Sequence, residues 1–294
     1  MKNLKIGIHT VNFTYPGGLE SIADTLIDIT KSCEKGGFYS VWPMDHFFQI
    51  GVHGPPEHEM LESYTTMGFM AGVTKKIKIG ALVTGVVYRY PGILAKTVST
   101  LDVLSKGRAY LGIGAAWNEQ ESRSLGIPFP PLKERYERLE ETLQIVKQMW
   151  SGNEQPFHGK HYTLERLLDS PKPITQPHPP ILIGGTGEKK TLKLVAKYAD
   201  ACNIIANSGV DFAKQKLDVL KMHCQKLGRN YNEIEKTFLY TVDFSQTTTD
   251  KVNSVLKQFA KLGFSHGIFT IKQDHDMKVL EKISNEVIPV ASDL

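Results

Sequence analysis

The chain has 294 residues, of which 41% are hydrophobic and 22% charged, so it is long enough to bury a large core. Its 35 Lys and Arg residues exceed its 31 Asp and Glu residues only slightly and are dispersed, which argues against nucleic-acid binding and is compatible with a small anionic ligand. No apolar run approaches the roughly 18 residues of a membrane span, and the N-terminus lacks the apolar core of a signal peptide.

The cysteines predict a reducing environment. Cys33, Cys202 and Cys224 lie far apart in the chain and form no C-x-x-C pair, so we expect buried free thiols. Together with the missing signal peptide, this pattern indicates a cytoplasmic protein.

Short runs rich in Ile and Val alternate with longer segments of helical period along the chain. We predict strands at residues 4–9, 39–43, 77–83, 109–113, 181–183, 202–206, 238–244 and 267–271. We predict helices at residues 22–33, 63–73, 92–104, 132–150, 189–199, 211–227, 250–262 and 276–286. Alternation over this length favours one α/β domain spanning residues 1–294, a (β/α)8 TIM barrel, over a doubly wound open sheet.

Two segments rich in Gly and Pro interrupt this alternation, at residues 46–63 and 152–180. We expect both to be insertion loops above the C-terminal face of the barrel, where barrel enzymes carry their active sites. The first contains His46, His53 and His58 with acidic neighbours, but their spacing matches no zinc pattern. We therefore predict no metal site.

Asp45 and His46 end the second predicted strand, at the mouth of the expected barrel. A histidine can give or take a proton near neutral pH, and the neighbouring carboxylate could orient it. The pair is therefore a catalytic candidate. The alternative is a strand-terminating Asp followed by a surface His without a function.

The fifth predicted strand is followed directly by a turn of small residues: Gly184, Gly185, Thr186 and Gly187. Glycines let backbone N–H groups approach a phosphate, and a helix N-terminus carries partial positive charge, so this turn predicts a phosphate cradle. Lys189 and Lys190 would lie in the first helical turn, where a bound anion would offset their charges. A plain turn with solvated lysines is the alternative.

The sequence Gly112-Ile113-Gly114 invites comparison with a dinucleotide-binding fingerprint. The third glycine, the early helix and the acidic residue of that fingerprint are missing, so the pattern is weak evidence for such a site. Close packing between helix and strand explains Gly112 equally well.

Three stretches taken together are similar to one enzyme superfamily: KIKIGALVTGVVYRYPGILAKTVSTLDVLSKGRAYLGIGAAWNEQE, PKPITQPHPPILIGG and GGTGEKK. They resemble the bacterial luciferase-like superfamily, and within it the branch that depends on the deazaflavin coenzyme F420. The resemblance covers most of residues 1–205, whereas the last third matches only by its alternation. It implies a (β/α)8 barrel that binds a flavin or a deazaflavin.

The resemblance also implies which residues contact the cofactor. The third strand would carry a cis peptide bond between Ala81 and Leu82 and would lie, with Val83, under the central ring. Asp45 and His46 would lie beside the ring. Residues after the fourth strand would line the cofactor and substrate pocket: Ala115, Ala116, Trp117 and Asn118.

Two cofactors are compatible with the resemblance. With F420 the implied reaction is hydride transfer to or from a small organic substrate; with reduced FMN it is monooxygenation by O2, with a flavin reductase as partner. A non-catalytic flavin-binding protein is a further interpretation. The F420-dependent dehydrogenases carry a Glu where Trp117 stands here, which argues against a sugar-phosphate substrate. Members of the superfamily are often dimers, so we expect a homodimer.

Overall fold

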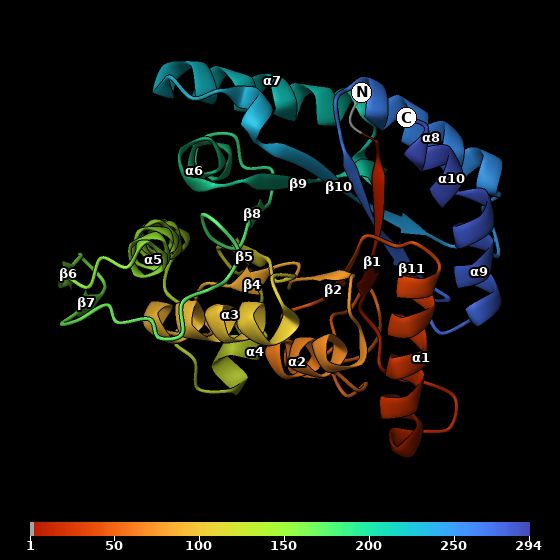
Figure 1. The fold of residues 1–294 in the computed structure, drawn as a ribbon, viewed down its shortest axis with the longest axis horizontal. Helices are drawn as coiled ribbons and strands as arrows, with labels where there is room; N and C mark the ends of the chain where they lie inside the picture. The colour runs from red at the N-terminus through yellow and green to blue at the C-terminus, as the bar shows by residue number, and fades with distance from the viewer. Residues whose placement is uncertain (1–2) are drawn as a thin grey trace.

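The computed structural model describes residues 3–294 (Figure 1). Its strands are β1 (Lys5–Thr10), β2 (Ser40–Pro43), β3 (Lys78–Ile79), β4 (Thr84–Gly85), β5 (Leu111–Gly114), β6 (Phe157–His158), β7 (Thr163–Leu164), β8 (Ile181–Gly184), β9 (Ala201–Ile205), β10 (Glu235–Val242) and β11 (His266–Ile271). Its α-helices are α1 (Ile22–Lys35), α2 (Ser63–Val73), α3 (Pro91–Ser105), α4 (Glu119–Ser124), α5 (Leu132–Ser151), α6 (Thr191–Tyr198), α7 (Val210–Leu227), α8 (Thr249–Lys261), α9 (Met277–Glu286) and α10 (Ile288–Ser292). Short 3-10 helices are η1 (Leu19–Ser21), η2 (Ala206–Ser208) and η3 (Tyr231–Glu233).

Within the described residues, nine strands form one parallel sheet in the order β3-β2-β1-β11-β10-β9-β8-β5-β4. The strands at the two ends of this order, β3 and β4, are separated in the chain only by residues 80–83, so the sheet curls round on itself. An isolated bridge between Ile79 and Ala109 joins the end of β3 to the segment that leads into β5. The predicted α/β architecture is confirmed as a curled parallel sheet.

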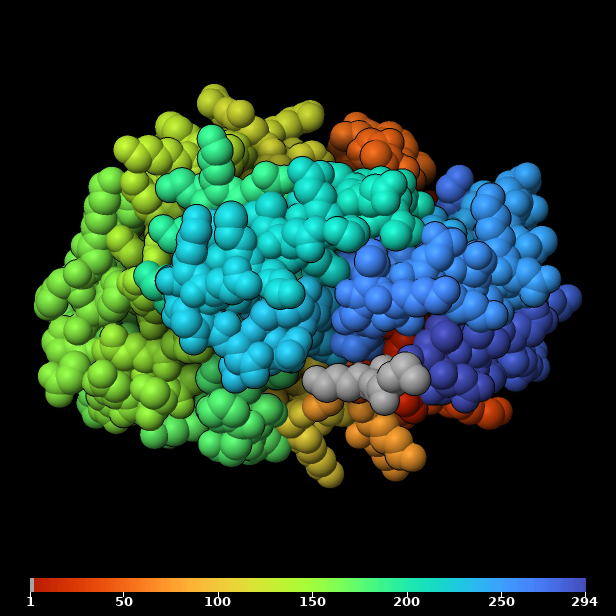
Figure 2. Space-filling view, turned by 90° about the horizontal axis from the view of Figure 1, so that it is seen from above, coloured from red at the N-terminus to blue at the C-terminus, as the bar shows by residue number. Residues whose placement is uncertain are grey.

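The helices lie on the outside of the curled sheet, and the two termini are close together (Figure 1). Seen from above, α7 covers the middle of the molecule, with α5 and its neighbours toward one end and the C-terminal helices toward the other (Figure 2). The Leu4 N–H donates to the Ala291 carbonyl oxygen at 3.2 Å. This hydrogen bond joins the residue before β1 to α10.

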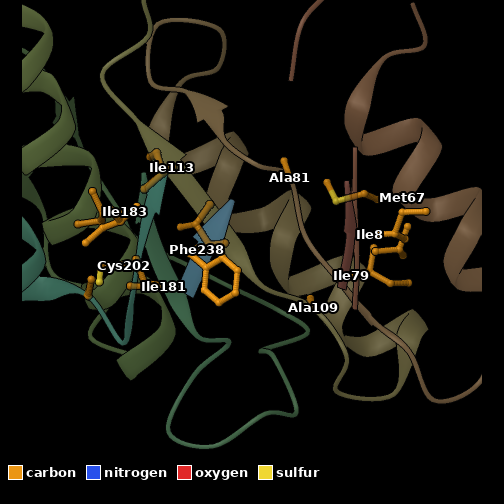
Figure 3. Packing of buried hydrophobic residues seen from close by; sticks show 14 of the residues in the cluster. Ile8, Met67, Ile79, Ala81, Ala109, Ile113, Ile181, Ile183, Cys202 and Phe238 are labelled. Atoms are coloured by element: carbon orange, nitrogen blue, oxygen red, sulfur yellow. The ribbon is translucent and has the colours of Figure 1, made fainter. Parts of the chain in front are cut away.

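Apolar side chains from the sheet and the helices fill the interior (Figure 3). Ile8 and Ile79 of the sheet lie near Met67 of α2, whereas Ile183 and Phe238 lie in another part of the same core. Burial on both faces explains why β8 begins as a continuous apolar run, Ile-Leu-Ile, rather than as an alternating sequence. The predicted buried free thiols are confirmed for all three cysteines.

Most predicted helices and strands are confirmed, and α2 has the predicted bounds. The third predicted strand, residues 77–83, is interrupted, because residues 80–83 leave the sheet as a bulge between β3 and β4. Helix α6 begins at Thr191, two residues later than predicted. Helices α4 and α10 have no counterpart among the predicted elements.

The segment 152–180 runs along α3. The ring of Tyr162 lies 6.4 Å from that of Tyr90 at the start of this helix, and Asp102 near its end accepts a hydrogen bond from the Thr175 backbone at 2.9 Å. None of its described residues lines the large cavity presented below. These contacts do not support the expected lid. A segment that joins a helix to the next strand leads to the N-terminal ends of the strands, opposite the face that carries the cavity.

Stability should fall as the solution is acidified below pH 6.5, because two histidines are buried in the neutral form. Burial and the nearby His53 lower the pKa of His9 to about 3, and burial lowers that of His266 to about 4. The unfolded chain takes up both protons near pH 6.5, so each histidine costs about 1.4 kcal/mol of unfolding free energy per pH unit, until its folded pKa is reached.

Urea denaturation between neutral pH and about pH 5 measures this slope. The variant His266→Gln should flatten the profile, whereas His158→Gln, which changes an exposed histidine, should leave it unchanged. A free energy of unfolding that is constant over this interval would contradict the expectation.

Candidate active site

A cavity of about 400 Å³ opens at the C-terminal ends of the strands. It brings together most of the residues that the sequence singles out: Asp45, His46, Leu82, Val83, Ala115, Ala116, Trp117, Gly184, Gly185, Thr186 and Gly187. Other residues also line it: Tyr88, Leu132, Tyr136, Thr191, Ile205 and Leu239. Two predicted residues do not line it, because Ala81 is buried and Asn118 caps α4. A cavity of this volume can hold a small organic ligand.

The bulge between β3 and β4 forms one wall of the cavity. The Leu82 N–H donates to the Pro43 carbonyl oxygen at 3.0 Å, and the peptide bond between Leu82 and Val83 is cis. The predicted position of the cis bond, between Ala81 and Leu82, is therefore wrong by one residue. The Ala81 carbonyl is turned toward Gly112 of β5, so Leu82 and Val83 face the cavity instead.

Three glycines make room for this bulge. A methyl group on Gly112 would fall far inside van der Waals contact with the Ala81 carbonyl oxygen. A Cβ on Gly114 or Gly184 would lie 2.9 Å from a methyl group of Val83. The Gly-Ile-Gly sequence is therefore explained by packing against the bulge.

The turn after β8 carries donors that a phosphate group requires. Gly185 has a φ of +109°, a backbone conformation that favours glycine. At the start of α6, the Thr191 Oγ1 lies 2.7 Å from the Tyr136 hydroxyl, and both residues line the cavity. These hydroxyls and the N–H groups of the helix N-terminus can donate to an anion. Lys189 and Lys190 are exposed and precede the helix, so they do not lie in its first turn as expected.

The catalytic candidate His46 is held by a buried glutamate. Its Nδ1 lies 2.7 Å from Oε2 of Glu121 in α4, whose side chain is 0% exposed. The same carboxylate accepts hydrogen bonds from the Phe47 and Phe48 backbone N–H groups and from the Tyr88 hydroxyl. Glu121 thus fixes the imidazole ring and leaves Nε2 as the nitrogen that can exchange a proton with a ligand.

The charge of Glu121 follows from these contacts. Burial alone would raise the pKa of Glu121, but the hydrogen bonds from His46 and from the Phe47 and Phe48 backbone lower it. The carboxylate is therefore ionised at neutral pH. The sequence holds one signal for this residue: Asn118 and Glu121 have the spacing of a helix-capping pair, and the Asn118 Oδ1 accepts from the Glu121 N–H at 3.3 Å.

Asp45 contacts Arg89 rather than His46. The Arg89 guanidinium donates to both carboxylate oxygens of Asp45, at 2.7 and 2.9 Å, and also pairs with Glu62. Burial raises the pKa of Asp45, and the ion pair with Arg89 opposes that rise. The expected role of Asp45 in orienting the histidine is therefore filled by Glu121.

An unusual turn places Trp117 over the site. Ala116 has a φ of +58°, which few residues with a Cβ adopt, and Arg135 donates to the Ala115 carbonyl oxygen at 3.0 Å. The Trp117 ring centroid lies 5.4 Å from that of His46 in an edge-to-face arrangement. The indole is 63% exposed and lines the cavity, so it is available to a ligand.

Replacing Glu121 with glutamine should slow turnover about 100-fold, because the amide keeps the shape but removes the carboxylate charge that holds Nδ1 of His46. The pH dependence of the rate should change as well, which a purely structural role would not produce. The matched control is Glu119→Gln in the same helix, since the exposed Glu119 pairs only with Arg123 among the described residues. Equal rates and pH profiles for the two variants would contradict the prediction.

Comparison with known proteins agrees with this geometry. A model of the family described as luciferase-like monooxygenase matches residues 4–282. This chain belongs to the luciferase-like monooxygenase family. The predicted resemblance is thereby confirmed. A curated relative from Kineococcus radiotolerans, named F420-dependent glucose-6-phosphate dehydrogenase, is 29% identical over 229 residues. The match covers 75% of this chain but only 64% of that relative, less than two thirds of its length.

Solved structures share the fold of this luciferase-like chain at low sequence identity. An F420-dependent secondary alcohol dehydrogenase in complex with an F420-acetone adduct has a TM-score of 0.80 and 18% identity, with 99% of each chain covered. A type II Baeyer-Villiger monooxygenase from Pseudomonas putida, in complex with FMN, has a TM-score of 0.75 and 18% identity, with 98% of each chain covered. The fold is thus one that oxidoreductases with either cofactor use.

In the described part of this luciferase-like chain, no helix is both long and apolar enough to cross a membrane. Among residues 3–294, no group of three or more His, Cys, Asp or Glu side chains could hold a metal ion.

Proposed function

We propose that this protein is an F420-dependent oxidoreductase that transfers hydride to or from a small organic substrate. One observation carries the proposal: a single cavity is lined both by a glycine turn with hydroxyl donors and by a histidine that a buried carboxylate holds. The names of F420-dependent relatives support the deazaflavin. We also infer that the curled sheet closes as a (β/α)8 barrel of one domain over residues 1–294, with the loop 46–63 at its C-terminal face.

The residues that line the cavity fit such a cofactor. The turn that contains Gly185, with the hydroxyls of Thr191 and Tyr136, would hold a phosphate group through neutral donors. The apolar side chains of Leu82 and Val83 offer a surface for a flat ring. Bound there, F420 would supply two-electron hydride chemistry.

The chain's own residues would orient the reactants and move a proton. His46 exchanges a proton through Nε2, because Nδ1 is engaged by Glu121. The Glu121 carboxylate holds the ring in one orientation through Nδ1. The indole of Trp117 stands edge-to-face to the His46 ring and would contact a reactant bound beside it.

The choice between F420 and FMN is open to a direct test. We expect the purified protein, titrated separately with oxidised F420 and with FMN, to bind F420 at least about tenfold more tightly. The reverse preference would favour a monooxygenase that uses O2 and reduced FMN, as the FMN-bound structural relative would suggest. Tight F420 binding without turnover of any donor or acceptor would favour a non-catalytic cofactor-binding protein, and binding of neither cofactor would overturn the proposal.

Replacing Gly185 with alanine should weaken cofactor binding about tenfold, because a residue with a Cβ rarely adopts its φ of +109° and the phosphate turn would have to change. Fluorescence or calorimetric titration measures the change. The matched control is Gly209→Ala, at a φ of +93° but outside the cavity, which should strain the backbone similarly and leave binding unchanged. Equal losses of affinity in the two variants would contradict a phosphate site at this turn.

We infer a cytoplasmic homodimer with a small-molecule substrate, and a flavin reductase as partner only if FMN is the cofactor. Light scattering during gel filtration tests the dimer, since a monomeric mass at micromolar concentration would contradict it.

A further inference from the structure

The lining of the cavity carries no cationic side chain for a substrate. Among the described residues that line it, none is Lys or Arg. Two arginines near the site are engaged elsewhere: Arg89 pairs with Asp45 and Glu62, and Arg135 donates to the Ala115 and Pro130 carbonyl oxygens. A phosphate or carboxylate on the substrate would therefore find neither Lys nor Arg beside His46, and the neutral donors after β8 would be taken by the cofactor phosphate, so burying that anion unpaired would be costly.

Large apolar side chains stand exposed around the same cavity. Trp117 is 63% exposed, Leu132 54% and Ile205 49%, and all three line it. They come from three separate places in the chain: the turn after β5, the start of α5 and the end of β9. Exposed apolar groups that converge on one cavity mark a surface that a ligand covers.

We propose that the substrate is an uncharged, mainly apolar alcohol or the corresponding ketone, and that phosphorylated sugars are excluded. The inference rests on the proposed hydride transfer and adds the class of substrate to it. It separates this chain from the relatives that are named glucose-6-phosphate dehydrogenases, whose name implies an anionic substrate.

The reaction in the oxidative direction balances with bound oxidised F420 as the hydride acceptor. The C–H bond of the alcohol carbon would break, and its electron pair would pass with the hydrogen, as hydride, to the cofactor. The O–H bond would break, and its proton would pass to Nε2 of His46. The alcohol would thereby be oxidised to a ketone and the deazaflavin reduced. Contact with Trp117, Leu132 and Ile205 would supply binding without a charge.

Calorimetric titration with cyclohexanol and with glucose 6-phosphate tests the inference, on both the F420-saturated and the cofactor-free protein. We expect cyclohexanol to bind at least about tenfold more tightly than glucose 6-phosphate. Tighter binding of glucose 6-phosphate, or binding of neither compound to either form, would overturn the inference. Failure of F420 itself to bind would overturn the proposed function separately, while the cofactor-free titration still decides the substrate class.

A charge introduced at the rim sharpens the test. The variant Ile205→Lys should weaken cyclohexanol binding about tenfold and strengthen glucose 6-phosphate binding by a similar factor. The matched control is Ile174→Lys, because Ile174 is 51% exposed but does not line the cavity, and its affinities should equal those of the unmodified protein. The same affinities in both variants would show that Ile205 does not contact the substrate and would overturn the inference.

Discussion

Replacing His46 with alanine should slow hydride transfer by about 100- to 10,000-fold, the range that a positioned general acid or base contributes. The affinity for F420 should change little, because the proposed phosphate donors belong to other elements, namely the turn after β8, the start of α6 and Tyr136 of α5. Stopped-flow measurement of the cofactor's visible absorbance gives the rate, and a fluorescence titration gives the affinity.

The control for this variant is His58→Ala in the same loop, since His58 is exposed and does not line the cavity. It should retain the rate of the unmodified protein. If His46→Ala retained that rate as well, His46 would not be the proton-exchanging group. If it lost the cofactor instead, the histidine would be a binding residue rather than a catalytic one.

Replacing Gly112 with alanine should lower the free energy of unfolding by about 3 kcal/mol, at the upper end of the usual cost of overpacking. The added methyl group would collide with the Ala81 carbonyl oxygen, a backbone atom that can move only if the bulge moves. Because the bulge also forms a wall of the cavity, cofactor binding should weaken in the same variant.

Urea denaturation compares this variant with Gly68→Ala in α2. Gly68 is exposed, and a Cβ there would meet nothing within 4 Å, so alanine should stabilise the helix by up to about 1 kcal/mol. Destabilisation of the two variants by equal amounts would contradict the claim that Gly112 is required by the bulge.

The fold could be predicted from the sequence because its strands are buried on both faces. Runs such as residues 181–183, and residues 267–271 apart from Thr270, are apolar and alternate with helical periods, and this pattern depends only on local order in the chain. The exact path of the third strand could not be predicted. Its interruption depends on close approach to Gly112 and Gly184, which are distant in sequence.

Part of the candidate site could also be predicted from the local order of residues along the strands. Small and polar residues at strand ends, such as His46 and Thr186, were found because position along a strand fixes where they lie. Glu121 was missed, since its contact with His46 joins two segments 75 residues apart and only a capping pattern marks it locally. The role expected of Asp45 failed because Arg89, 44 residues away, takes both of its carboxylate oxygens.

The Phe47 amide donates a hydrogen bond to Glu121, and its exchange with solvent would report, without substrate or cofactor, whether the His46 ring is held. One carboxylate holds both this amide and the His46 ring, so a motion that releases the ring also exposes the amide to solvent. The deuterium uptake of Phe47 would then track how much of the time the imidazole is locked in place. Site organisation could be compared among variants from this single backbone signal, before any reaction is known.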